Sequence, residues 1–429
     1  MMASMFNPRA RALLFAALLP LAAPASAQPS GRQQALDEFH TRFQAALTRH
    51  GIVGGASAFI HHDAGSSAVT FFDGEANAST HQSIDANTTY NWASITKTMT
   101  AIAILQLRDR GLLSLDDPAV KFIPELRQVH DAYGPVDAIT IRELLNHSAG
   151  FRNPTWPWEC DQPGDCAWEP FEPTRWQQVE AMLPYTHIDF APGSRWSYSN
   201  LGYVFLGQII ERLTGETFEG YITKNILMPL EMHSSYFNHA PYFLASHVSA
   251  SYIRSGSKLT AQPCDFDTGI TTANSGLKST MPDMAKYAAF LIGDTNKPVY
   301  NLILKRSSLE EMWTGTLPAI EPGKQATAYT SGPHASQPQM GLGFFILNLN
   351  GRKLIYHDGD QGGFSSELLI DPADSLASIL VVNTTDEGGT PTSQPTHAVS
   401  NTEPDSQTDL RQTLRTFELD QIFPAFAQK

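Results

Sequence analysis

The stretch that decides the fold is Ser94-Ile95-Thr96-Lys97, followed by the run Met99-Thr100-Ala101-Ile102-Ala103-Ile104-Leu105-Gln106-Leu107. A helix that is apolar on nearly every face is usually buried inside a domain. Ser94 and Lys97 are three positions apart, so they share one face at the start of this helix. A lysine is costly to bury without partners, and a serine beside a lysine of perturbed pKa is a candidate nucleophile. The alternative is a capping serine beside a solvated lysine.

The Ser-x-x-Lys spacing also occurs at Ser255–Lys258 and Ser275–Lys278. Both of these lie in stretches rich in Gly, Ser and Asn, which favour loops. Because only Ser94 begins an apolar helix, it is the candidate among the three.

The first 27 residues have the pattern of a secretory signal peptide. Arg9 and Arg11 precede an apolar stretch over 12–25, and Ala25-Ser26-Ala27 matches a small-x-small cleavage site. The apolar stretch is too short to span a bilayer. We therefore expect an exported protein, periplasmic or secreted, in which residues 1–27 are removed and residues 28–429 form a single domain.

Export bears on the three cysteines of the chain. Cys160 and Cys166 are separated by five residues in a stretch rich in Pro, Gly and Asp, and we expect a disulfide between them. Cys264 would then be unpaired, and we expect it to be buried and inert. The sequence holds no C-x-x-C or H-E-x-x-H motif, so we expect neither a metal nor another cofactor.

The formal net charge is −14. This acidic balance argues against non-specific binding to nucleic acid or to an anionic membrane. We expect the partner to be a small-molecule or peptide substrate. The sequence does not define the oligomeric state.

Hydrophobic periodicity predicts an α/β body that is interrupted by a helical insertion. We expect helices over 32–50, 94–111, 201–213 and 217–227, from 280 onward, and around 410–423. Strands are expected over 52–61, 67–72, 341–347, 353–357, 364–370 and 377–383. The α/β part would comprise about 28–90 and 340–429, and the helical part about 91–339.

Two further helix starts carry specific signals. Thr140-Ile141-Arg142-Glu143 matches a capping box, and Asp116-Asp117-Pro118 places a proline where a first helical turn tolerates it.

Three more motifs accompany Ser94. Tyr198-Ser199-Asn200 comes directly before a predicted helix, and His357-Asp358-Gly359 lies at the end of a predicted strand and is the only H-x-G in the chain. The third is the run Ile141-Arg142-Glu143-Leu144-Leu145-Asn146-His147-Ser148-Ala149-Gly150.

Together these motifs resemble the serine β-lactamase and penicillin-binding superfamily. Within it they are most similar to the branch of class C β-lactamases, D-Ala-D-Ala carboxypeptidases and β-lactamase-type esterases. The resemblance extends over most of residues 28–429 and includes Ser275-Gly276-Leu277-Lys278-Ser279-Thr280. It implies a β-lactamase/transpeptidase-like α/β fold, in which terminal helices flank an antiparallel sheet and a large, mostly helical segment is inserted.

The resemblance also implies a catalytic group. Ser94 would attack a carbonyl and form an acyl-enzyme, while Lys97 and Tyr198 would move its proton and return one to the leaving group. Which of the two is the base stays open. For Tyr198 to act as a base, a nearby cation must lower its pKa, and Lys97 is the expected source.

Binding roles follow from the same resemblance. Asn200 would hydrogen-bond a substrate amide. The backbone N–H groups of Ser94 and Asp360, which follows Gly359, would hold the oxyanion. His147 is expected to be structural rather than a general base.

The sequence departs from the family at its third motif, where β-lactamases of this branch usually carry Lys-Thr-Gly. His357 stands there instead, and an unperturbed histidine is mostly uncharged near neutral pH. The substitution argues against efficient penicillin hydrolysis. We therefore expect an exported serine hydrolase acting on an amide or ester, including peptides with D-amino acids. The alternatives are a class C-like β-lactamase and a non-catalytic penicillin-binding homologue.

Overall fold

The computed structural model describes residues 31–61, 67–151, 155, 173–263, 265–293, 297–320, 336–349, 351–386 and 406–427. The predictions for residues 1–27, and for Cys160, Cys166 and Cys264, lie outside the described residues.

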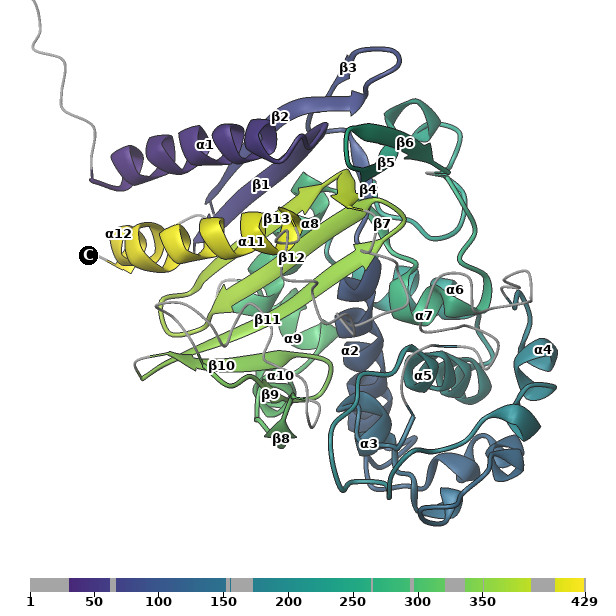
Figure 1. Cartoon of the computed structure of the whole chain (residues 1–429). Helices are drawn as coiled ribbons and strands as arrows, with labels where there is room; N and C mark the ends of the chain where they lie inside the picture. The colour runs from purple at the N-terminus through teal and green to yellow at the C-terminus, as the bar shows by residue number, and fades with distance from the viewer. Residues whose placement is uncertain are drawn as a thin grey trace, which may run out of the picture.

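A nine-stranded sheet forms the body, in the order β3-β2-β1-β13-β12-β11-β10-β9-β8 (Figure 1). All its neighbouring strands are antiparallel. β1 pairs directly with β13, which places Gly55 opposite Val382 and joins the two ends of the chain. The strand bounds are β1 Gly54–His61, β2 Ser67–Asn77, β3 Gln82–Ser83, β8 Leu317–Pro318, β9 Gln339–Met340, β10 Phe345–Leu349, β11 Arg352–Gln361, β12 Phe364–Asp371 and β13 Leu376–Val382. The predicted antiparallel sheet is confirmed.

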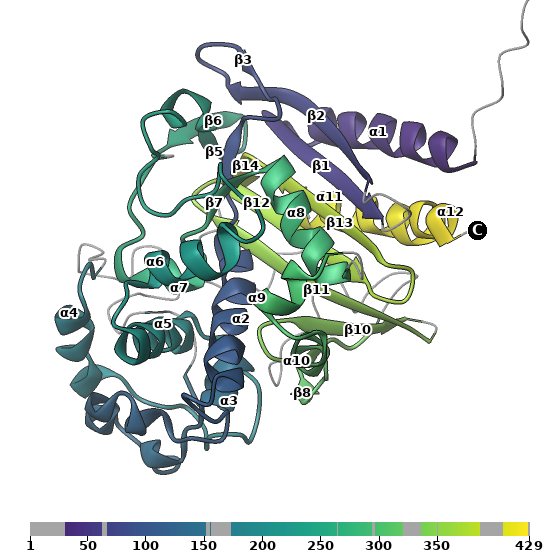
Figure 2. The ribbon, with the colours of Figure 1, turned by 180° about the vertical axis from the view of Figure 1, so that it is seen from behind.

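Helices cover both faces of this sheet. The N-terminal helix α1 (Gly31–Arg49) and the C-terminal segments α11 (Ser406–Phe417), η9 (Glu418–Ile422) and α12 (Phe423–Ala427) lie together on one face (Figure 1). α1 buries Leu36, Phe39 and Phe43, whose spacing puts them on one side of the helix. On the other face α8 (Met281–Ile292) packs across β1, β12 and β13 (Figure 2). The strands β12 and β13 are therefore buried along their whole length.

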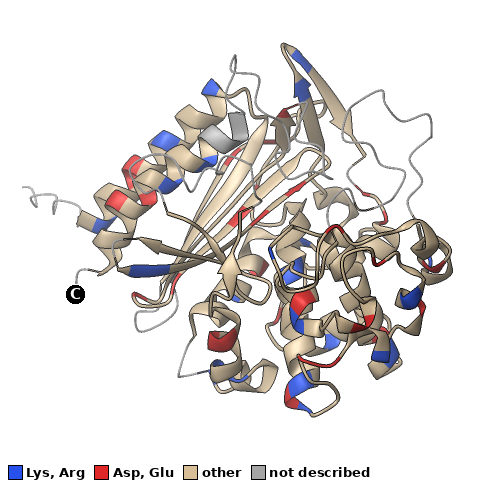
Figure 3. Ribbon diagram, turned by 60° about the horizontal axis from the view of Figure 1, so that its bottom comes forward, with Lys and Arg blue, Asp and Glu red and all other residues tan. Residues whose placement is uncertain are grey.

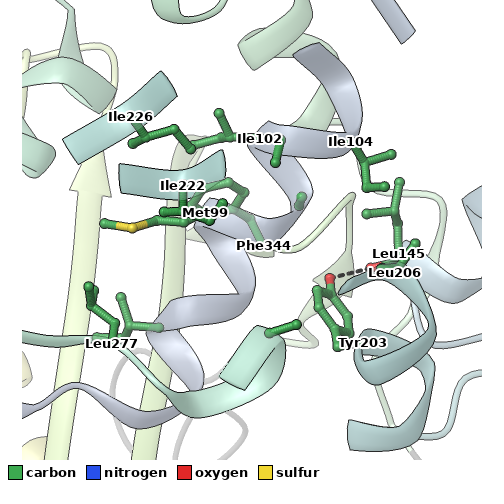
Figure 4. Close-up of a cluster of buried hydrophobic side chains, with 14 of the residues drawn as sticks. Met99, Ile102, Ile104, Leu145, Tyr203, Leu206, Ile222, Ile226, Leu277 and Phe344 are labelled. Carbon is green, nitrogen blue, oxygen red and sulfur yellow. Dashed lines mark hydrogen bonds between the residues drawn. The ribbon is translucent and has the colours of Figure 1, made fainter. Parts of the chain in front are cut away.

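The helical part is built around α2 (Thr96–Asp109). Every residue from Thr96 to Leu107 is buried, as the apolar run predicts. Figure 4 shows side chains of α2, such as Met99 and Ile102, among side chains from the helices around it. The other helices are α3 Ile141–Leu145, α4 Trp176–Glu180, α5 Asn200–Thr214, α6 Phe218–Ile222 with η6 Thr223–Leu227, α7 Thr272–Ser275, α9 Val299–Ile303 and α10 Arg306–Met312.

Short 3₁₀ turns connect these helices. They are η1 Ala93–Ile95, η2 Ala119–Lys121, η3 Pro124–Gln128, η4 Val136–Ala138, η5 Leu183–Tyr185, η7 Ala245–His247 and η8 Gly269–Thr271. The helix start predicted at Asp116-Asp117-Pro118 yields only the turn η2. By contrast, the predicted capping box forms as expected, with Thr140 and Glu143 bonding each other's backbone at the start of α3.

Two small sheets complete the fold. One consists of β14 (Thr384–Asp386), β5 (Ser251–Ser255) and β6 (Lys258–Gln262), and the other of β4 (Thr89–Asn91) and β7 (Lys278–Thr280). The loop expected at Ser255–Lys258 is the turn of the β5–β6 hairpin. The loop expected at Ser275–Lys278 is limited to residues 276–277, because Ser275 ends α7 and Lys278 begins β7, and both are buried.

Charged residues of both signs are spread over the helices, whereas the large sheet carries few (Figure 3). Among the residues that the structure describes, no helix combines the length and the apolar character needed to cross a membrane.

Candidate active site

Ser94 lies in the turn η1, immediately before α2. Its predecessor Ala93 has φ +47°, a backbone conformation that is strained for any residue except glycine. The side chain of Asn91 stabilises this turn, because its Oδ1 accepts the Ala93 N–H at 2.7 Å. On the other side of this turn, the backbone N–H of Trp92 donates to the Leu277 carbonyl at 2.9 Å. The position of Ser94 is therefore fixed by the backbone before it.

Lys97 lies one helical turn after Ser94 and is fully buried. Its Nζ donates to Ser94 Oγ at 3.0 Å and to the backbone carbonyl of Asn274, in α7, at 3.0 Å. Burial holds the pKa of Lys97 well below the ordinary value of a lysine. The structure thus places an amine that favours its neutral form within hydrogen-bond distance of the serine.

Tyr198 lies in the extended segment that leads into α5. The next residue, Ser199, caps this helix by accepting the Gly202 N–H at 3.1 Å. The ring of Tyr198 lies 4.9 Å from Lys97 Nζ, and its hydroxyl shares a hydrogen bond with the Ser94 side chain. Ser94, Lys97 and Tyr198 therefore meet at one point, although Tyr198 lies far from the other two in the sequence.

The pKa of Tyr198 corrects a prediction. Burial raises it above the ordinary value of a phenol, and this outweighs the lowering by the hydrogen bond with Ser94. The condition under which Tyr198 would act as a base, a pKa lowered by Lys97, is therefore not met. Burial also lowers the pKa of Lys97, which disfavours an ammonium beside the phenol.

His357 lies within β11 and is buried. Its Nδ1 donates to the Asp358 carbonyl at 2.6 Å, which assigns the proton to Nδ1. Burial, with a smaller effect of Lys97, lowers the pKa of His357 to about 3. The imidazole is therefore uncharged throughout the neutral range, more firmly than an unperturbed histidine.

Gly359 lies where β11 passes the turn η1. A Cβ atom at this position would lie 2.5 Å from the Trp92 carbonyl oxygen, 2.6 Å from Ser366 Oγ and 3.1 Å from the Ser94 nitrogen. Such distances leave no room for a side chain. The glycine therefore lets the strand approach the backbone of Ser94.

The remaining predicted site residues, Asn200 and Asp360, lie at the start of α5 and in β11. Asn200 is the first residue of α5 and is buried. Asp360 follows Gly359 in β11, and its carboxylate accepts hydrogen bonds from Ser365 Oγ at 2.6 Å and from Arg411 Nη1 of α11 at 3.2 Å. The structure thus gathers the predicted residues from η1, α2, the start of α5 and β11.

Sequence reasoning missed two supports of this site. The carbonyl of Asn274 holds the Lys97 amine, and the side chain of Asn91 holds the strained turn. Neither residue carries a sequence signal of its own, because both act through long-range packing onto α2 and η1.

The fold is that of the serine β-lactamase and penicillin-binding protein superfamily, a group of serine hydrolases. Residues 39–400 match the sequence profile of the family described as Beta-lactamase, and the chain belongs to this family. Protein flp of Staphylococcus aureus (strain COL) is 27% identical over 303 residues, which cover 70% of this chain and 54% of that protein. The chain thus spans about half the length of the curated relatives it matches.

Solved structures agree with this assignment. An octameric penicillin-binding protein homologue from Pyrococcus abyssi superposes with a TM-score of 0.67 at 27% identity, over 83% of this chain and 74% of that chain. A D-stereospecific amidohydrolase from Streptomyces sp. gives a TM-score of 0.61 at 25% identity, over 81% and 94% of the two chains. A class C β-lactamase has the same fold, with a TM-score of 0.67 at 18% identity over 91% and 98%.

Proposed function

We propose that this protein is an exported serine hydrolase that cleaves an amide or ester through an acyl-enzyme on Ser94. The observation that carries the proposal is the fully buried Lys97, whose Nζ lies 3.0 Å from Ser94 Oγ. A serine hydroxyl is a weak nucleophile until an adjacent base takes its proton. A desolvated amine whose pKa is lowered by burial, at hydrogen-bond distance, meets that requirement.

Of the two candidate bases, the electrostatics favour Lys97. In the reaction the hydrogen bond between Lys97 Nζ and Ser94 Oγ reverses, so that the lone pair of the neutral amine takes the Ser94 proton as Oγ bonds to the substrate carbonyl carbon. Tyr198, whose raised pKa keeps its phenol protonated, gives its proton to the departing group as the bond to that group breaks. The Lys97 ammonium then returns a proton to the phenolate, and the acylated enzyme is left neutral.

The oxyanion of this reaction would be held by backbone N–H groups of Ser94 and Asp360. The support is the close approach of β11 to η1, which only a glycine at position 359 permits. Asn200, at the start of α5, is proposed to bind the substrate amide. Removing one oxyanion donor typically costs about 10²–10³ in rate.

The substrate class follows from His357 and from the relatives. An imidazole with a pKa of about 3 offers no positive charge to a substrate carboxylate, which disfavours efficient hydrolysis of penicillins and favours uncharged acyl groups. The Streptomyces neighbour is a D-stereospecific amidohydrolase, and a Bacillus subtilis relative, 28% identical over 38% of this chain, is Penicillin-binding protein 4*. We therefore propose D-amino-acid amides, peptides and esters as substrates.

The test is intact mass spectrometry after incubation with a fluorophosphonate and, separately, with a labelled penicillin, beside an assay with a p-nitrophenyl ester. We expect a fluorophosphonate adduct on Ser94, ester turnover, and a persistent penicillin adduct. Ser94→Ala should fold and lose both adduct and turnover. Rapid loss of penicillin without an adduct would instead identify a β-lactamase, and absence of any adduct or turnover would identify a non-catalytic homologue.

The same preparation tests the proposed processing. When the full chain is expressed with export, the mass should match a mature protein that begins at Gln28, and it should be lower by two hydrogen atoms if Cys160 and Cys166 are joined. An intact residue 1–27 segment, or free thiols at both cysteines, would contradict these two proposals independently of the catalytic one.

A further inference from the structure

His147 has contacts that its expected structural role does not fully explain. It follows α3 and adopts φ +60°, in the left-handed region. In this conformation the residue presents two acceptors to one neighbouring segment. Its carbonyl oxygen accepts the Ser197 N–H at 2.9 Å, and its ring nitrogen Nδ1 accepts the Ser199 N–H at 3.1 Å. The backbone N–H groups of the two residues that flank Tyr198 are thus bound to a single residue.

The imidazole also packs against the phenol itself. The ring centroids of His147 and Tyr198 are 4.4 Å apart, with an angle of 32° between the planes. A second contact joins His147 to Tyr203, at 5.2 Å, and the Tyr203 hydroxyl donates to the Leu145 carbonyl at 2.9 Å (Figure 4). The ring is therefore fixed from α3 and from α5 and cannot move without disturbing Tyr198.

The protonation state of His147 suits this contact. Because Nδ1 accepts a hydrogen bond, the ring proton belongs on Nε2, which is buried and has no hydrogen-bond partner among the described residues. Burial, together with the nearby Lys97 and His357, lowers the pKa of His147 well below its ordinary value. The ring thus remains neutral and cannot lose its acceptor by protonation near neutral pH.

We infer that His147 is a positioning residue for Tyr198, which holds the phenol where it can protonate the leaving group. The inference rests on the proposed function, in which Lys97 takes the Ser94 proton and Tyr198 supplies the proton to the leaving group. A residue that acts in this way affects one step selectively. A misplacement of about 1 Å can cost about 10²-fold in rate, so the effect is measurable.

The leaving group provides the selective test. An alkyl ester and a p-nitrophenyl ester of the same acid give the same acyl-enzyme, but an alkoxide needs a proton to leave and p-nitrophenolate does not. The value of kcat/KM for each ester reports the steps up to acylation. In His147→Phe, which keeps a ring and loses the Nδ1 acceptor, we expect kcat/KM for the alkyl ester to fall by about 10²-fold. The value for the p-nitrophenyl ester should fall far less.

His147→Asn is the matched variant. Asparagine keeps an acceptor at the δ1 position and tolerates a positive φ better than most residues, so it should restore much of the alkyl-ester activity. Tyr198→Phe should show the same preference for the p-nitrophenyl ester, and adding His147→Phe to it should cost little more, because both changes affect one group. If His147→Phe does not fold, the comparison of His147→Asn with His147→Ala carries the same expectation.

Equal losses on the two esters, or full additivity with Tyr198→Phe, would overturn the inference, since a general effect on the fold lowers both activities alike. Such a result would leave the proposed function intact. A wild-type protein that shows neither a Ser94 adduct nor ester turnover would instead refute the proposed function itself.

Discussion

Gly359→Ala tests the close approach of β11 to the serine. The added Cβ atom would lie 2.5 Å from the Trp92 carbonyl oxygen, and ordinary contact begins at 3.4 Å, so the two backbones must separate by about 0.9 Å. Rotation of a side chain cannot relieve this, because the nearest atom belongs to the backbone. Overpacking of this kind typically costs about 1–3 kcal/mol of unfolding free energy. A displacement near 1 Å at the oxyanion site should also lower kcat/KM by about 10²-fold.

Urea unfolding and ester hydrolysis would measure the two effects. Gly202→Ala is a suitable control for stability, because a Cβ atom there meets its nearest neighbours at 3.7 Å, an ordinary contact, and lies in the helix α5. An alanine in a helix is favoured over glycine by roughly 0.5–1 kcal/mol, so this variant should not lose stability. Unchanged stability and unchanged kcat/KM in Gly359→Ala would refute the argument from close approach.

Three further predictions concern charge and the turn before the serine. Burial raises the pKa of Glu418 to about 8 in the folded protein, above the ordinary value of 4.5 that applies to the unfolded chain. The contribution of the protonated carboxyl to the free energy of unfolding is therefore complete below the unfolded-state pKa, and it is lost as pH rises through the folded-state pKa. Glu418→Gln should therefore be less sensitive to pH in urea unfolding between about pH 5 and 9, and equal pH dependence in both proteins would contradict this. His357→Lys should raise the rate at which penicillin acylates Ser94, measured by mass spectrometry, because it supplies a cation for the substrate carboxylate; an unchanged rate would argue against that view of selectivity. Asn91→Ala leaves the buried Ala93 N–H without its acceptor and should cost about 1–3 kcal/mol in thermal or urea unfolding, whereas Asn91→Asp, which keeps an acceptor, should lose less.

Much of the fold was predictable where local signals and burial agree. The stripe over 201–213 forms α5, which begins after the cap of Ser199 and ends at Gly215, whose φ is +70°. The apolar run after Ser94 forms the buried helix α2. In both elements the hydrophobic period, the terminal signals and the tertiary packing favour the same structure, so sequence alone is sufficient.

Other elements depend on long-range contacts. The strand β7 has three residues and pairs with β4, so no periodicity could reveal it. The burial of Lys278 in this strand is tolerated because its Nζ donates to the carbonyl of Phe266 at 2.7 Å. The H-x-G motif was expected at the end of a strand, but β11 continues to Gln361, because β12 remains its partner to that point. The strand length is set by the neighbour rather than by the local sequence.

The candidate site shows the same division. The motifs identified Ser94, Lys97 and Tyr198, and the structure brings them together. The direction of the Tyr198 pKa could not be predicted, because it depends on the burial of the phenol and of the neighbouring amine. Sequence reveals which groups meet, whereas their protonation depends on how much water the surrounding side chains exclude.

The pairing of β1 with β13 also bears on how the protein folds. The Gly54 N–H donates to Asn383 Oδ1 at 2.8 Å, a contact between residues 329 positions apart. Contacts of such high sequence separation form slowly, because the entropy of closing a long loop is lost before the contact is gained. During synthesis the hairpin of β1 and β2 must wait with one edge open until nearly the whole chain is available, and an open edge can pair with another chain. Truncation near the C-terminus should therefore leave an aggregation-prone N-terminal hairpin rather than a smaller folded protein.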